Sequence, residues 1–227
     1  MDMRPSTILA IDCDAEVQRI AERLLAIVAD DFRRRGVVVA LSGGVDSSVC
    51  VALACKAFGA ARVLALLLPE KESSAKSAKL GRRVAEQFGV PCLSHDITAA
   101  LEAIGCYTIR DQAIRAVIPE YGEGWKSKVV ISGGLEGRVH FFKLVAQSPD
   151  GRMTEKRLPH KEYLEIVAAQ NFKQRIRKTV EYFHADRLHY AVLGTPNRLE
   201  YDQGFFVKNG DGSADVKPIA HLYKTQV

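Results

Sequence analysis

The sequence predicts an α/β fold, a doubly wound parallel sheet with flanking helices. Short apolar runs such as "VVVAL" at 37–41 and "RVLALLL" at 62–68 are typical of buried parallel strands. Segments with helical spacing of their apolar residues lie between these runs, as in "SSAKSAKLGRRVAEQFG" at 73–89. Strands that alternate with helices are joined by crossover connections and therefore run parallel in one sheet.

The elements follow one another in a regular order. A first helix is expected from the spacing of Val17, Ile20, Leu24 and Val28, with Asp14 as its N-cap. After it we expect a strand at 37–41, a glycine turn, a helix at 47–58, a strand at 62–68, a helix ending at Gly89 and a short strand within 91–97. The middle of the chain is expected to form a helix-like piece from 106, a glycine-rich loop, and a β-hairpin at 138–158 that turns at 148–151. A helix from 160 to about 186 and a strand at 190–195 follow.

Length and composition favour a single domain over residues 1–227. A chain of 227 residues, 47% of them hydrophobic, is long enough to bury a substantial core, and its composition is even along its length. Residues 106–161, which contain the inserted β-hairpin region, are expected to form an atypical insertion within that domain.

Several classes of protein are excluded or disfavoured. The sequence has no apolar run long enough for a membrane span and no signal-peptide pattern at its start, which predicts a cytoplasmic protein with no membrane partner. Five cysteines without a C-x-x-C pair and six scattered histidines argue against a disulfide framework or a zinc site. A net charge of +5 suits an enzyme that handles polyanionic nucleotides, but it is too small to indicate a nucleic-acid partner.

The stretch "LSGGVDSS" at 41–48 predicts a phosphate-binding turn between a strand and a helix. Gly43 and Gly44 allow positive φ and a close approach of a ligand to the main chain, and the helix start supplies free N–H groups. The turn lacks the lysine of the G-x-x-x-x-G-K-[ST] motif, so it is not an ordinary nucleoside-triphosphatase loop. A second Ser-Gly-Gly at 132–134 lacks the Asp-Ser pair and is expected to be only a turn.

Two carboxylates are candidates for a magnesium site. Asp46 would repel bound phosphates unless a divalent cation lay between them, although helix capping is the simpler explanation of the residue taken alone. Glu200 follows the last predicted strand, whose end lies at the same sheet edge as the glycine turn. Asp46 and Glu200 could therefore hold one Mg²⁺ ion, whereas the segment around Glu200 taken alone is explained equally by a solvated loop with turn residues.

Six motifs in order resemble the NAD synthase family of PP-loop ATP pyrophosphatases, which have the adenine nucleotide alpha hydrolase-like fold. These motifs are "LSGGVDSS", "LLLPEKESS", "NFKQRIRKT", "LGTPNRLE", "GFFVKNGDGSADVKP" and "LYKTQV". They cover most of the chain outside residues 104–168. The glycine turn is shared with related enzymes that make GMP, asparagine or argininosuccinate, whereas the three C-terminal motifs are far more specific to this family.

The resemblance implies a role for each matching residue. The ATP-binding set is Ser42, Gly43, Gly44, Asp46, Ser47, Thr195 and Lys224; the set for nicotinic acid adenine dinucleotide is Arg175, Lys208 and Asp211; the Mg²⁺ ligands are Asp46 and Glu200. Asp46, Lys224 and Asp211 are the residues expected to act in catalysis. The neighbouring cations Lys173, Arg177 and Lys178 are expected to form a solvated helix face.

The reaction implied by the resemblance has two steps. The pyridine carboxylate attacks the α-phosphate of ATP and releases pyrophosphate, and ammonia then displaces AMP to form the amide. Mg²⁺ and the lysines would stabilise the charge on the departing pyrophosphate. The family usually forms homodimers, and the sequence shows no glutaminase module before its first strand, so free ammonia or a separate ammonia donor is the expected nitrogen source.

Two alternatives stay open. The atypical region 106–161 is compatible with an amide-forming ATP pyrophosphatase that acts on a different carboxylate. The sequence also ends at Val227, where the family begins another helix, so we expect a chain truncated at its C-terminus. A nucleotide-binding homologue without catalysis is compatible with that ending. An RNA-thiolating relative is less favoured because no cysteine pair is placed for sulfur transfer.

Overall fold

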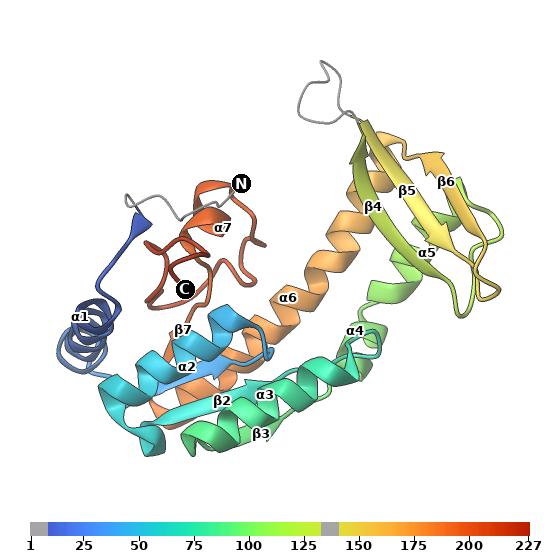
Figure 1. Cartoon of the computed structure of the whole chain (residues 1–227). Helices are drawn as coiled ribbons and strands as arrows, with labels where there is room; N and C mark the ends of the chain where they lie inside the picture. Colours follow the sequence, from blue (N-terminus) through green and yellow to red (C-terminus); the bar gives the residue numbers. More distant parts are fainter. Residues whose placement is uncertain (1–8, 133–140) are drawn as a thin grey trace. The chain divides into compact units, whose positions relative to one another are not determined.

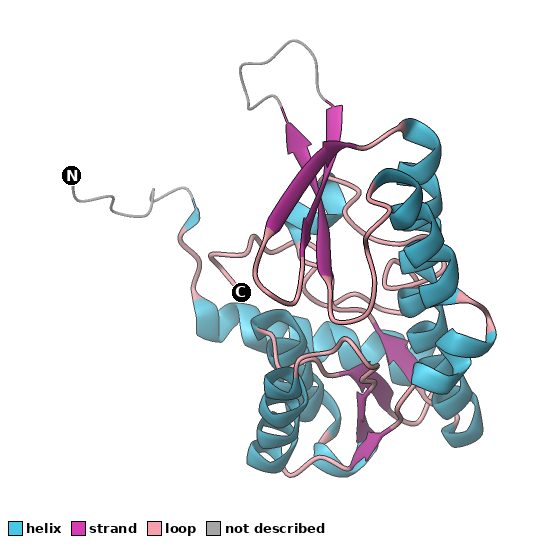
Figure 2. Ribbon diagram, turned by 90° about the vertical axis from the view of Figure 1, so that its right-hand side faces the viewer, coloured by secondary structure: helices cyan, strands magenta, loops and turns pink. Residues whose placement is uncertain are grey.

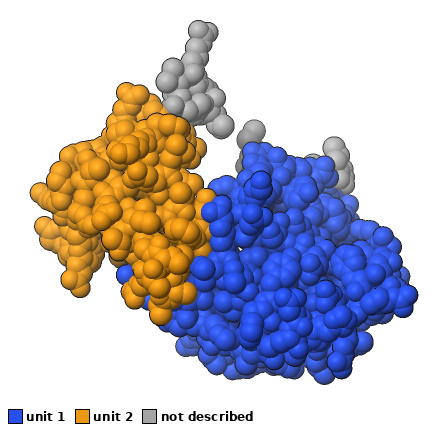
Figure 3. All heavy atoms as spheres, turned by 180° about the vertical axis from the view of Figure 1, so that it is seen from behind, with its two compact units in different colours: residues 1–98, 174–227 blue, residues 99–173 orange. Residues whose placement is uncertain are grey.

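The computed structural model describes residues 9–132 and 141–227 (Figure 1). It divides into two compact units, one formed by residues 1–98 and 174–227 and the other by residues 99–173 (Figure 3). The interpretation of residues 1–227 as one domain with an insertion at 106–161 stays a prediction. Two predictions fall on residues outside the described ranges. They are the turn at the second Ser-Gly-Gly, of which only Ser132 is described, and the first residues of the predicted hairpin, 138–140.

The first unit contains a four-stranded parallel sheet in the order β3-β2-β1-β7. Its strands are β1 (Val37–Ala40), β2 (Val63–Leu67), β3 (Cys92–Ser94) and β7 (Ala191–Leu193). Each was predicted from its apolar run, and the observed strands are shorter than the predicted runs by one to four residues. The run at 37–40 is buried except at Ala40, as expected of a strand covered on both faces.

Helices cover both faces of this sheet, as Figure 2 shows. On one face, α1 (Cys13–Leu25), α2 (Val45–Phe58) and α3 (Ala75–Phe88) bury a cluster with Val37, Val39 and Ala65. On the other face, the C-terminal part of α6 (His160–Leu188) packs against Val38 and Leu66. Because neighbouring strand residues point to opposite faces, both layers are filled from the same short strands. The prediction of a doubly wound parallel sheet is confirmed.

The cap of the first helix differs from the prediction. The backbone N–H of Ala15 donates to Oδ1 of Asp12 at 3.1 Å, so Asp12 is the N-cap and the expectation for Asp14 is wrong. Asp12 has the extended backbone of a cap residue, with φ −76° and ψ 102°. Asp14 lies in the first turn, where a carboxylate interacts favourably with the helix dipole. A π-helix, η2 (Ala26–Asp31), continues from α1.

The second unit contains an antiparallel sheet in the order β4-β5-β6. Its strands are β4 (Lys126–Ser132), β5 (Phe141–Gln147) and β6 (Met153–Arg157). The turn that joins β5 and β6 confirms the predicted hairpin, with Ser148 N–H donating to the Arg152 carbonyl at 3.0 Å and Gly151 at φ 89°. A glycine-rich loop was predicted where β4 lies, and that prediction is wrong for the residues of β4. Pairing with β5 stabilises this strand, although its own apolar pattern is weak.

The described residues contain four further helical segments. They are α4 (Thr98–Ala103), α5 (Cys106–Val117) and α7 (Arg198–Asp202), together with the short 3₁₀ helix η3 (Ala60–Arg62). Within the second unit, α5 and the N-terminal part of α6 contribute Ile114 and Ile166 to a core that also holds Leu144 of β5. Among the described residues, no helix combines the length and the apolar character needed to cross a membrane.

Candidate active site

The turn between β1 and α2 is held by the hydroxyl groups of Ser42 and Ser47. The Ser42 and Ser47 Oγ atoms lie 3.2 Å apart, and Gly44 N–H donates to Ser42 Oγ at 3.2 Å. Ser47 Oγ also donates to the Gly44 carbonyl at 3.0 Å. These contacts hold the turn against the N-terminus of α2, where the first N–H groups of a helix have no intrahelical acceptor. Such an arrangement is suited to binding phosphate.

Gly43 brings this turn into close contact with α3. Its φ is 77°, in the left-handed region that favours glycine. A Cβ atom added here would lie 2.6 Å from Leu80 Cβ and 2.9 Å from the Ser77 carbonyl oxygen. The position therefore excludes a side chain both through its backbone conformation and through its surroundings.

Asp46 on the first turn of α2 is the centre of a charged group at the end of the sheet. Its Oδ2 accepts from Nζ of Lys224 in an ion pair, and its Oδ1 lies 3.4 Å from Nδ2 of Asn197. The side chain of Asp46 is 18% exposed. Residues far apart in the sequence, on α2 and in the C-terminal segment, thus meet at one carboxylate, which the ammonium of Lys224 neutralises.

Asn197 also connects Asp46 to the second predicted metal ligand. Its backbone N–H donates to Glu200 Oε2 at 3.0 Å, and its Oδ1 accepts from the N–H groups of Leu199 and Glu200. These bonds form a capping box at the start of α7. Asn197 is 3% exposed. The two carboxylates predicted to bind Mg²⁺ therefore contact the same buried side chain or its backbone.

The donor set fits a magnesium ion that is also bound by phosphate. Within 9–132 and 141–227, no group of three or more His, Cys, Asp or Glu side chains is arranged to hold a metal ion. Mg²⁺ usually takes only one or two carboxylates and fills its other positions with substrate phosphate and water. Two carboxylates next to a turn that is suited to binding phosphate match that requirement.

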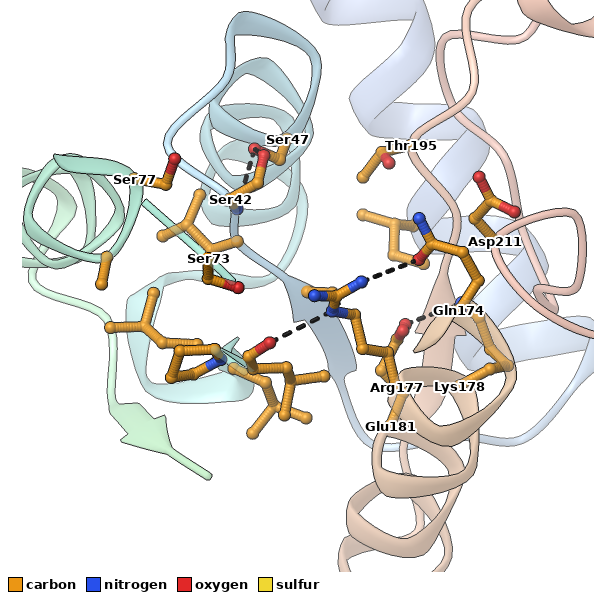
Figure 4. A pocket seen from close by; sticks show the side chains of 18 of the residues that line it. Ser42, Ser47, Ser73, Ser77, Gln174, Arg177, Lys178, Glu181, Thr195 and Asp211 are labelled. Atoms are coloured by element: carbon orange, nitrogen blue, oxygen red, sulfur yellow. Dashed lines mark hydrogen bonds and ion pairs between the residues drawn. The ribbon is translucent and has the colours of Figure 1, made fainter. Parts of the chain in front are cut away.

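A cavity of about 400 Å³ lies beside the turn (Figure 4). Ser42, Ser47, Thr195 and Asp211 are the predicted site residues that line it. The apolar part of its wall comes from Ala40, Leu41, Leu66, Leu67, Leu68, Pro69, Ala78 and Leu193. This combination of hydroxyl groups and apolar wall suits a ligand with an anionic part and a flat apolar part.

Helix α6 supplies the charged wall of the cavity, which corrects one prediction. Arg177 Nε donates to the Leu68 carbonyl at 3.1 Å, and Lys178 Nζ pairs with Glu181 Oε2 at 2.7 Å. Lys178 and Glu181 are 6% and 3% exposed. The expectation of a solvated helix face is therefore wrong for Lys178 and for the cavity-lining Arg177, because this part of α6 packs against the sheet. Lys173 belongs to the second unit, where it lies 5.4 Å from the Tyr107 ring centroid.

Burial raises the pKa of the Glu181 carboxyl, and the charge of Asp211 acts in the same direction. The neighbouring ammonium of Lys178 opposes this rise and stabilises the carboxylate. The cavity thus contains a desolvated acidic group that is paired with Lys178 and lies in the field of a second cation, Arg177.

The predicted dinucleotide-binding residues gather around one segment. Arg175 Nε donates to the Lys208 carbonyl at 3.2 Å, and Asp211 Oδ1 accepts from the Val207 N–H at 2.7 Å. Asp211 lines the cavity, whereas Arg175 and Lys208 are exposed beside it. Arg175 binds main chain here, so its guanidinium holds the 207–211 segment against α6.

The family model of NAD synthase matches residues 16–119 and 144–227. The chain belongs to the NAD synthase family. The NH(3)-dependent NAD(+) synthetase of Rhizobium rhizogenes is 59% identical over 223 residues, covering 98% of this chain and 67% of the relative. That of Rhizobium meliloti is 58% identical over 220 residues, covering 96% of this chain and 66% of the relative. The chain therefore spans about two thirds of the length of these relatives.

Solved structures of an NMN synthetase and of an NAD synthetase share the fold. An NMN synthetase from Francisella tularensis aligns with a TM-score of 0.67 at 22% identity, covering 96% of this chain and 68% of that one. An NH3-dependent NAD synthetase from Campylobacter jejuni, in complex with a nitrate ion, aligns with a TM-score of 0.65 at 21% identity, covering 96% and 71%. The predictions of the family and of its fold class are confirmed.

Sequence reasoning missed three side chains of this candidate site: Asn197, Lys178 and Glu181. Asn197 lay within a quoted family motif, and its position three residues before Glu200 is a capping-box signal. Lys178 and Glu181 have the i, i+3 spacing of a helical ion pair. That spacing does not distinguish a buried pair from the solvated pairs that are common on helices.

Proposed function

We propose that this NAD synthase family member amidates nicotinic acid adenine dinucleotide with ammonia and ATP, giving NAD, AMP and pyrophosphate. The observation that carries the proposal is the carboxylate Asp46, held beside the Ser42–Ser47 turn and contacted by Lys224 and Asn197. It occurs in a chain that is 59% identical to a protein named NH(3)-dependent NAD(+) synthetase. On these two grounds we assign the activity named for that relative to the present chain.

In the first step a carboxylate oxygen of the pyridine ring forms a bond to the α-phosphorus of ATP, and the bond to the bridging oxygen of pyrophosphate breaks. Ser42, Gly43, Gly44 and Ser47 would hold the β- and γ-phosphates through hydroxyl and backbone N–H groups. Thr195 and Lys224 would contact ATP, and Lys224 adds a positive charge near the leaving group.

In the second step ammonia attacks the activated carbonyl carbon, AMP leaves with the bridging oxygen, and a proton is lost from nitrogen. Arg175, Lys208 and Asp211 would orient the dinucleotide, with Asp211 reaching the cavity and the two cations outside it. Asp46 and Glu200 would hold Mg²⁺, which when bound neutralises phosphate charge. Positioning and charge stabilisation account for the chemistry without a protein nucleophile.

Assembly, nitrogen source and location are part of the same proposal. A homodimer in the cytoplasm that uses free ammonia, or ammonia from a separate donor, is what the family resemblance implies. Light scattering of the purified chain measures the assembly directly. A mass of about 50 kDa, twice the 25.0 kDa of one chain, is expected.

A different carboxylate acceptor is the second candidate. The family model leaves residues 120–143 unmatched, and these include β4 of the second unit. If this segment served substrate choice, another pyridine or aliphatic carboxylate would be adenylated by the same ATP site.

The test is formation of AMP and NAD from MgATP, ammonium and nicotinic acid adenine dinucleotide. Asp46→Asn removes the proposed metal ligand and should lower the rate by about 100-fold or more, since metal and oxyanion contacts contribute several kcal/mol to such reactions. Asp202→Asn is the matched control, because Asp202 on α7 is exposed and pairs only with Arg198 among the described residues. AMP formed only when another carboxylate replaces the dinucleotide would favour the different acceptor, and ATP binding without either product would favour a non-catalytic homologue.

A further inference from the structure

Both carboxylates that are predicted to bind Mg²⁺ accept hydrogen bonds from nitrogen donors of this chain. Asp46 Oδ2 accepts from Nζ of Lys224, and Asp46 Oδ1 accepts from Nδ2 of Asn197 at 3.4 Å. Glu200 Oε2 accepts from the backbone N–H of Asn197 at 3.0 Å. The two donors of Asn197 are neutral, so they leave the negative charges in place. Lys224 is different, because its ammonium cancels the charge of Asp46.

The ion pair of Lys224 and Asp46 opposes the binding of a second cation. Two cations that contact one carboxylate lie only a few ångströms apart and repel each other, most strongly where water is partly excluded. The side chain of Asp46 is 18% exposed, so water screens this repulsion only in part. Asp46 is therefore a poor ligand for a free divalent cation while Lys224 contacts it.

The side chain of Lys224 can leave Asp46 without a movement of the backbone beside it. The Leu222 carbonyl accepts from the Arg198 N–H at 2.9 Å, and the Arg198 Cζ lies 4.8 Å from the centroid of the Tyr223 ring. These contacts hold the main chain next to Lys224 against α7. The Lys224 side chain itself is 49% exposed and has a flexible four-carbon stem. Rotation about its side-chain bonds is enough to carry the ammonium to another anion.

We propose that Lys224 is an exchangeable counter-ion of Asp46, which excludes free Mg²⁺ and moves to the triphosphate when nucleotide and metal arrive together. This inference rests on the proposed function, which puts the triphosphate at the Ser42–Ser47 turn and the metal at Asp46. A triphosphate offers the ammonium a new anion as the metal takes its place on the carboxylate. Each charge keeps a partner of opposite sign through the exchange, so no buried charge is left unpaired.

The experiment measures binding of Mn²⁺ to the purified chain without nucleotide, from the loss of the free-ion signal in electron paramagnetic resonance. Mn²⁺ prefers the same oxygen ligands as Mg²⁺. Lys224→Met removes the ammonium and keeps a flexible side chain. It is expected to raise the affinity for Mn²⁺ by about tenfold or more, as for removal of a contact between charged groups. Lys224→Arg keeps the charge and should bind Mn²⁺ as weakly as the wild type.

ATP should increase the affinity for Mn²⁺ by a larger factor in the wild type than in Lys224→Met. Only the wild type has an ammonium on Asp46 that the nucleotide must draw away. Equal factors in the two proteins would overturn the exchange.

Two further variants locate the effect. Lys56→Met removes the charge of an exposed lysine on α2 and should leave the affinity for Mn²⁺ unchanged. Lys224→Met combined with Asp46→Asn should lose the gain of the single variant. Equal affinities of the wild type and Lys224→Met, or a gain that survives Asp46→Asn, would overturn the inference whether or not NAD is formed. The expected Mn²⁺ results in a protein that forms no NAD would overturn the proposed function alone.

Discussion

The Nε2 atoms of His95 and His184 lie 3.0 Å apart and join the segment after β3 to helix α6. Arg187 Nε, which can only donate, lies 2.9 Å from Nδ1 of His184. Nδ1 of His184 therefore accepts, its Nε2 carries the proton, and Nε2 of His95 accepts in turn. This order of donors holds only while both rings are neutral.

Stability should consequently fall in mild acid. Burial, followed by the charges of Arg187 and His95, lowers the pKa of His184 below its ordinary value of 6.5. Below pH 6.5 the unfolded chain takes up a proton that the folded chain excludes, so the free energy of unfolding decreases by up to about 1 kcal/mol per pH unit. Thermal unfolding between pH 7.5 and 5.5 measures this loss.

His184→Gln should remove that part of the pH dependence, because glutamine does not titrate. His160→Gln provides the control, since His160 is exposed at the start of the same helix. If the stability of the His184 variant followed pH as steeply as that of the wild type, another group would be responsible.

Asn197 should have separable effects on stability and on metal-dependent binding. Asn197→Ala removes the cap of α7 and should lower the free energy of unfolding by about 1 kcal/mol. Asn197→Ser keeps a capping oxygen but lacks the amide that faces Asp46 at 3.4 Å. The KM for MgATP should therefore rise by about tenfold in both variants, as for a lost bond to a charged group.

Denaturant unfolding and nucleotide kinetics of the two variants test this separation. Equal KM values for the serine variant and the wild type would show that the amide does not support Asp46. Equal stabilities of the alanine and serine variants would show that the cap contributes little.

Gly43→Ala should be more destabilising than an alanine at another left-handed glycine. Gly89 has φ 63° and an added Cβ there meets nothing within 4 Å, so Gly89→Ala should lower the free energy of unfolding by only about 1 kcal/mol. At Gly43 the same conformational strain is joined by a contact of 2.6 Å to Leu80 Cβ. A loss larger by about 1–3 kcal/mol is expected, by analogy with overpacked cores.

The Gly43 variant should also bind ATP more weakly, because relief of the Leu80 contact must move the turn that carries Ser42. Unfolding midpoints and ATP titrations of both variants check this. Similar losses in the two variants would contradict the close packing of the turn on α3.

The buried pair of Lys178 and Glu181 should respond differently to single and double replacement. Lys178→Met alone leaves an uncompensated buried carboxylate and should lower the free energy of unfolding by about 3–5 kcal/mol. Lys178→Met combined with Glu181→Leu removes both charges and should come within about 1 kcal/mol of the wild type, or exceed it. Denaturant unfolding of the wild type, of Lys178→Met and Glu181→Leu alone and of the double variant gives the coupling, and additive losses would argue against a direct interaction.

Glu16 should stabilise the fold at neutral pH and lose this effect in acid. Hydrogen bonds from Arg19 and then His221, at 2.5 Å each, lower the pKa of Glu16 from 4.5 to about 2. The contribution is present above pH 4.5 and is lost as the pH falls towards 2, because the unfolded chain binds the proton first. Glu16→Gln should be less stable than wild type by about 1 kcal/mol at pH 7, after allowance for solvent screening, and equally stable near pH 2. Glu22→Gln, on the exposed face of α1, is the control.

Sequence by itself determined the parallel sheet, the strand–turn–helix around Ser42 and the family. Each of these features is predicted by residues that lie close together in the sequence. Examples are the apolar run at 37–40, the Gly43–Gly44 pair and the motifs of fixed spacing. The hairpin at 148–151 was predictable for the same reason, because Ser-Pro-Asp-Gly favours a turn wherever it stands between strand-like segments.

Only the tertiary structure decided which groups meet and which are buried. β4 forms because β5 pairs with it, Lys178 is buried because this part of α6 packs on the sheet, and Asn197 reaches Asp46 across more than a hundred residues of chain. Burial and long-range contact depend on elements that are distant in sequence. For this reason the i, i+3 spacing of Lys178 and Glu181 could not show that their charges lie in a cavity wall, where desolvation makes each depend on the other.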